Sequence, residues 1–133
     1  MNRIIDASAL ASLAARACSG AACGCLKHDL RGWAHWPVGY REEDFRKIGT
    51  LQLKPVEDCT LDEYHPQATI YWSAEAPIAP AYYPYNQSSV WECVHCQRAY
   101  LRHDDDGAYH VAPRIRLVQA GLVVEADPAQ GAP

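Results

Sequence analysis

The residues best suited to chemistry are two cysteines separated by two residues, Cys93 and Cys96. This spacing lets both sulfurs point at one spot, which serves either a soft metal ion or a dithiol–disulfide cycle. The flanking residues favour a metal, because the β-prone residues 90–92 precede the pair and Tyr100 follows it. We therefore predict a zinc-knuckle-like turn between two strands that supplies two ligands to Zn²⁺.

A structural zinc ion takes four ligands, so two more are needed. Cys23 and Cys25 are the preferred pair, because Gly24 between them gives the backbone room to turn both sulfurs inward. Four other residues remain as alternative ligands: Cys18, His28, His103 and His110.

The roles of His103 and His110 as ligands depend on a predicted hairpin. Asp106-Gly107 is a strong signal for a two-residue turn, and with that loop His103 faces His110 on one face of the sheet. Two exposed histidines beside a run of aspartates are the alternative interpretation.

Two enzymatic functions are possible alternatives. His95 between the cysteines would stabilise a thiolate in a CxxC dithiol redox protein, but only 37 residues follow Cys96 and they read as hairpins. A zinc ion with an open position would make a small metal-dependent hydrolase, with His35 or His65 as base. No nucleophile, base and orienting residue can be assembled by spacing, so we expect a protein that is not an enzyme.

Length and charge narrow the class of protein. The chain has 133 residues, which suits a single domain, and a net charge of -4, which argues against nucleic acid as a partner. No apolar run approaches the roughly 20 residues that span a bilayer. Asp6 and Arg16 interrupt the apolar N-terminal stretch, so we expect no secretion signal and a cytoplasmic protein whose thiols stay reduced.

The elements that must position these residues follow from local patterns. Residues 6–18 predict a helix capped by Asp6 or Ser8, and residues 1–27 comprise this helix and a cysteine-rich loop. Residues 68–125 predict most of an antiparallel sheet, including a strand at 68–72, and residues 126–133 a flexible tail.

The predicted fold is therefore a single α+β domain over 1–133, with the N-terminal helix packed on a mainly antiparallel sheet. Its expected core combines helix and sheet residues: Leu10, Leu13, Trp33, Ile70, Trp72, Trp91, Tyr100, Val111, Ile115 and Leu117.

Several short segments together carry a resemblance. They are Leu30-Arg31-Gly32-Trp33, Glu63-Tyr64-His65-Pro66, Tyr71-Trp72-Ser73, Ala76-Pro77-Ile78-Ala79-Pro80, Tyr83-Pro84-Tyr85-Asn86, Cys93-x-x-Cys96 with Arg98-Ala99-Tyr100-Leu101-Arg102, and Arg114-Ile115-Arg116. With these the chain resembles, from about residue 25 to 125, a family of small uncharacterised bacterial proteins with a single CxxC motif. The resemblance implies a shared shape, a bacterial origin and a shared CxxC site, but no activity.

The function expected from these observations is that of a small zinc-stabilised binding or adaptor protein. Its partner would be another protein, with homodimerisation through a sheet edge as the competing possibility. Trp36, Tyr40 and the Pro/Tyr-rich residues 77–85 are the candidate contact surfaces, because aromatic side chains dominate binding hot spots.

Overall fold

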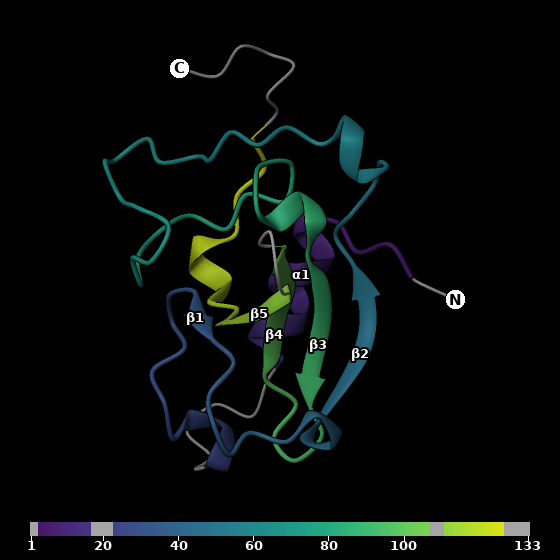
Figure 1. Cartoon of the computed structure of the whole chain (residues 1–133), viewed down its shortest axis with the longest axis vertical. Helices are drawn as coiled ribbons and strands as arrows, with labels where there is room; N and C mark the ends of the chain where they lie inside the picture. The colour runs from purple at the N-terminus through teal and green to yellow at the C-terminus, as the bar shows by residue number, and fades with distance from the viewer. Residues whose placement is uncertain (1–2, 17–22, 107–110, 127–133) are drawn as a thin grey trace.

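The N-terminal helix forms where its cap predicts. The computed structural model describes residues 3–16, 23–106 and 111–126, and α1 (Ala7–Ala15) is the α-helix within them (Figure 1). Asp6 caps it, since its side chain accepts a hydrogen bond from the Ala9 backbone N–H at 2.8 Å. The predicted end at residue 18 lies outside the described residues.

The sheet has five antiparallel strands in the order β1-β5-β4-β3-β2. Their bounds are β1 Ala34–His35, β2 Phe45–Thr50, β3 Ser89–Cys93, β4 Ala99–Asp106 and β5 Val111–Leu117. One helix and one antiparallel sheet confirm the predicted single α+β domain. Within the described segments, no helix has both the length and the apolar character that crossing a membrane requires.

The sheet begins earlier in the chain than predicted. Strands β3 to β5 lie within residues 68–125, but β1 and β2 come before them. The predicted strand at 68–72 was wrong: these residues form turns, and Ala68 adopts a positive φ of 63°. Ile70 is 62 % exposed and Trp72 is 47 % exposed, so neither belongs to the core. Strand propensity describes how a side chain fits a half-buried sheet, and residues 68–72 pair with none of the described strands.

The hairpin between β4 and β5 also differs from its prediction. Asp106 pairs with Val111, which excludes the predicted two-residue loop at Asp106-Gly107, and residues 107–110 lie outside the described residues. His103 pairs with Arg114 rather than with His110, which lies outside the described residues. Moving the register by four residues keeps each side chain on its original face, so alternation alone does not distinguish the two registers.

Alternate residues of β4 belong to two hydrophobic clusters, one on each face of the sheet. In β4, Leu101 packs into a cluster with Leu10 of α1, while Tyr100 faces the opposite cluster, which contains the cysteines. The central strand therefore has both faces covered, and Figure 1 shows α1 behind the sheet. Leu10, Trp33, Tyr100 and Ile115 are buried as predicted, and three further predicted core residues are partly buried: Leu13, Trp91 and Leu117. The side chain of Val111 is not described.

A buried arginine ties the long middle segment to the sheet. Arg116 of β5 is 0 % exposed, although the alternating pattern of its strand gave no sign of burial. Its guanidinium donates to the hydroxyl of Tyr85 and to the carbonyl of Ala76 at 2.7 Å. It also donates to the carbonyl of Arg31 at 2.8 Å. These acceptors offset the cost of removing the charge from water.

Candidate metal centre

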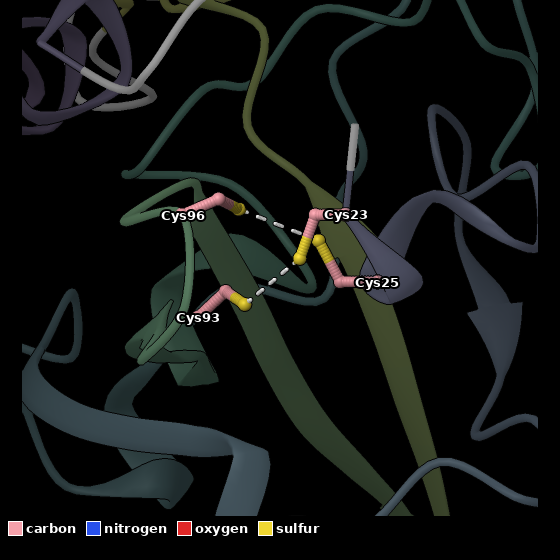
Figure 2. A group of neighbouring side chains, drawn as sticks. All are labelled: Cys23, Cys25, Cys93 and Cys96. Carbon is pink, nitrogen blue, oxygen red and sulfur yellow. Dashed lines mark hydrogen bonds between the residues drawn. The ribbon is translucent and has the colours of Figure 1, made fainter. Parts of the chain in front are cut away.

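Four cysteines from two distant parts of the chain converge at one end of the sheet. The sulfurs of Cys23, Cys25, Cys93 and Cys96 all lie within 4.8 Å of one another. The Cys23 and Cys93 sulfurs are 3.6 Å apart, as are those of Cys25 and Cys96. Figure 2 shows the four side chains pointing toward a common centre. The structure thus brings together the four residues that the sequence singled out, in a cluster that could hold a metal ion.

Two of the sulfur–sulfur distances are close to those of tetrahedral coordination. Zinc–sulfur bonds of about 2.3 Å place the sulfurs of a tetrahedral site about 3.8 Å apart. The two 3.6 Å separations are close to this value and far longer than the roughly 2.05 Å of a disulfide bond. All four cysteines are free thiols. Soft thiolate sulfur is a donor that Zn²⁺ and other soft ions prefer, so the donor set suits such an ion.

The second cysteine pair lies on a tight turn after a strand. Cys93 ends β3, and the Gln97 N–H donates to its carbonyl at 2.8 Å, which closes the turn. Gln97 has a φ of 62°, a left-handed conformation that reverses the chain before Arg98. The Cys93 N–H then donates to the Arg98 carbonyl at 3.0 Å. The turn thus brings both sulfurs to the same side.

The first pair lies on a single helical turn. Cys23 precedes a 3₁₀ turn, η1 (Gly24–Leu26), that contains Cys25. The Leu26 N–H donates to the Cys23 carbonyl at 3.0 Å, which folds the backbone so that both sulfurs face the β3–β4 turn. Two hydroxyls hold this loop in place: Tyr40 donates to the Cys25 carbonyl at 2.7 Å, and Tyr100 donates to the Cys25 sulfur at 2.9 Å. The position of Tyr100 after the cysteine turn follows from the sequence, but no sequence pattern indicates that Tyr100 or Tyr40 contacts Cys25.

The thiols differ in their acidity. Burial raises the pKa of Cys25 and of Cys93, although the backbone N–H groups of His95 and Cys96 lower the pKa of Cys93 in part. Burial also acts on Cys96, but the backbone N–H and guanidinium of Arg98 outweigh it and lower the pKa of Cys96 to about 7. Positive groups that face the sulfurs favour thiolates, the form that binds a metal ion.

A cavity adjoins the cluster. Its volume is about 530 Å³, and it is lined by Cys23, Gly24, Cys25, Lys27, Val38, Gly39, Tyr40, Asp44, Phe45, Cys93 and His95. Asp44 accepts a hydrogen bond from the Val94 N–H at 2.9 Å through its backbone carbonyl, and its carboxylate contacts the His95 ring at 3.1 Å. Cys23 is half-buried, so the cluster contacts this cavity. Neither His35 nor His65 lines it.

The alternative ligands do not join the cluster among the residues that are described. The backbone N–H of His28 donates to the Tyr40 hydroxyl, and its ring packs against that tyrosine. His103 is buried, and its Nε2 lies 2.6 Å from the Tyr71 hydroxyl. His65 contacts the Glu63 carboxylate and the Thr69 hydroxyl, each at 2.7 Å. Cys18 and His110 lie outside the described residues.

Comparisons of the chain with protein-family models, with curated proteins and with solved structures found no match to it.

Proposed function

We propose that this protein is a small, non-enzymatic binding or adaptor module whose fold is stabilised by one Zn²⁺ ion in a Cys₄ site. The observation that carries the proposal is the convergence of four free thiols whose sulfurs all lie within 4.8 Å of one another. Zinc is favoured among soft ions because a closed Cys₄ set is a common structural zinc site. The turn at residues 93–96 would then act as a zinc knuckle.

The number of ligands supports a structural role. Catalytic zinc sites keep one position open for water, whereas four thiolates complete a tetrahedral shell. The hydrolase alternative is therefore less well supported. The redox alternative needs Cys93 and Cys96 as the reacting pair, yet Cys93 lies 3.6 Å from Cys23, and Cys96 lies 3.6 Å from Cys25. A redox pair uses two thiols, whereas all four sulfurs lie within 4.8 Å of one another, and this favours a bound ion.

The proposed zinc site also fits a reducing compartment. Cys₄ coordination requires free thiols, and the cytoplasm keeps thiols reduced, so we place the protein there. The described strands pair in four antiparallel ladders, of which β2–β3, β3–β4 and β4–β5 join strands that are consecutive in the chain. We propose that the module acts by binding another protein.

The test is metal content and spectroscopy of the full chain purified without chelator. We expect one zinc ion per chain in the wild type and in Cys59→Ser, a cysteine outside the cluster, and well under one in Cys93→Ser. Replacement by Co²⁺ should give the visible spectrum and the intense sulfur-to-metal charge-transfer bands of a tetrahedral tetrathiolate. Co²⁺ spectra of an octahedral oxygen site, or wild-type protein that binds no metal, would contradict the proposal.

A further inference from the structure

The cavity beside the cysteine cluster combines negative charge with apolar walls. Four thiolates and one divalent ion carry a net charge of −2, and the Asp44 carboxylate on the wall adds another negative charge. Lys27 is the one lysine or arginine among the lining residues and offsets a single charge. Arg98 contacts Cys96 from outside the cavity and offsets a second charge, which leaves the metal centre and the cavity wall with one net negative charge. The cavity therefore attracts a cation when the metal is bound.

One exposed apolar residue lines the cavity, and two others are next in sequence to residues that line it. Val38 lines the cavity and is 98 % exposed. Leu26 and Val94, which follow Cys25 and Cys93 directly, are also among the exposed large apolar residues of the described chain. The rings of Tyr40 and Phe45 form part of the wall, with ring centroids 6.3 Å apart. Aromatic faces attract cations and also pack against aliphatic chains.

A basic side chain satisfies both features. The aliphatic stem of arginine or lysine packs on apolar walls while its charged head reaches carboxylate and thiolate groups. A free anion or a phosphate backbone would be repelled by the thiolates and the carboxylate. A purely apolar segment would bring no positive charge to Asp44. The volume of about 530 Å³ accommodates one long side chain together with the apolar residues beside it.

We infer that this cavity is the docking site for a protein partner, and that it binds one arginine or lysine flanked by apolar residues in an exposed peptide segment. The inference rests on the proposed function, because the metal–thiolate charge contributes to the attraction. It deepens that function by stating which partner chemistry the module recognises.

The test uses the zinc-loaded full chain and three synthetic peptides. They are acetyl-Gly-Leu-Arg-Leu-Gly-amide and the same peptide with glutamate or citrulline in place of arginine. Binding is followed by the amide ¹H–¹⁵N shifts of Gly24, Gly39 and Tyr40. We expect the arginine peptide to move these signals and to bind at least fivefold more tightly than the citrulline peptide. The glutamate peptide should not bind.

Two variants and one matched control locate the site. Asp44→Asn removes the carboxylate charge while leaving the backbone carbonyl that holds the turn, and Val38→Lys places a positive charge at the rim. Each should weaken the arginine peptide at least fivefold. Leu61→Lys adds the same charge at an exposed residue that does not line the cavity, and it should leave affinity unchanged.

The outcomes separate the inference from the proposed function. Wild-type protein that contains no metal would contradict both the proposed function and the inference. A full zinc complement with equal binding of the arginine and glutamate peptides, or with equal effects of Val38→Lys and Leu61→Lys, would overturn the inference alone. Sedimentation that shows a dimer, with concentration-dependent shifts at Gly39 and Tyr40, would instead assign the cavity to a second copy of the chain and would also overturn it.

Discussion

Metal removal should destabilise the fold by an amount that the chain topology predicts. A metal held by Cys25 and Cys93 closes a loop of roughly 70 residues, and closing such a loop removes about 4 kcal/mol of conformational entropy from the unfolded chain. Stripping the ion with a chelator restores that freedom. We therefore expect the free energy of unfolding to fall by about 4 kcal/mol, a large share of the 5–15 kcal/mol typical of a domain.

The observed loss should be smaller than the full binding free energy of the ion. Structural zinc binds with apparent free energies of about 10–16 kcal/mol in zinc-finger peptides, but unfolded thiols retain part of this affinity. The loop-closure contribution is what the folded chain gains because the ion links residues that are distant in sequence. It can therefore be measured as the difference in the free energy of unfolding between the metal-loaded and the metal-free chain.

Urea unfolding with and without chelator measures this difference. With an m value of about 2 kcal/mol/M, the loss corresponds to a shift of the midpoint of about 2 M. Cys25→Ser lacks one ligand, so its midpoint should barely respond to chelator, whereas Cys59→Ser should respond like the wild type. Comparing each protein with itself removes the separate cost of placing a serine hydroxyl at a buried cysteine.

Two results would refute this reasoning. A wild-type midpoint that moves by less than about 0.5 M on chelation would mean that the cluster contributes to the fold as reduced thiols alone. Equal shifts in the wild type and in Cys25→Ser would mean that the chelator acts at another site.

Three further predictions concern the rest of the fold. Arg116→Met should lower the free energy of unfolding by about 3–5 kcal/mol in urea titrations, because it leaves buried carbonyls without their donor; a loss like that of Arg41→Met, an exposed arginine, would contradict it. Gly32→Ala should cost about 1–3 kcal/mol, since a Cβ atom there would lie 2.2 Å from the Trp72 carbonyl oxygen, whereas Gly121→Ala, with open space around it, should be tolerated. Hydrogen bonds from Arg31 lower the pKa of Asp29 to about 2, so the pair should stabilise the fold above the ordinary carboxyl pKa of 3.8 and lose this effect as the pH falls through 2. NMR titration of the Asp29 carboxyl checks this value, and Arg31→Ala should return it toward 3.8; a titration midpoint that does not move in the variant would show that the guanidinium is not the cause.

Local features of this protein could be predicted from the sequence because they depend on neighbouring residues. Asp6 caps α1 because its side chain reaches the backbone N–H three residues ahead. The turn at residues 93–96 depends on cysteines that are close in the chain, and β3 and β4 flank it as their residue types predict. The choice of Cys23 and Cys25 as partners followed from counting ligands, and the structure places their sulfurs beside those of Cys93 and Cys96.

Tertiary packing decided what local pattern could not. The β4–β5 register places His103 opposite Arg114. Registers four residues apart put each side chain on the same face, so the alternating pattern could not choose between them, and packing in the folded protein did. Ile70 and Trp72 are exposed despite their strand propensity, because residues 68–72 pair with none of the described strands. Arg116 is buried because carbonyls from a distant segment and the Tyr85 hydroxyl surround it, and no property of its own strand encodes those acceptors. The cavity beside the cysteines likewise exists only where residues 23–27, 38–45 and 93–95 come together in space.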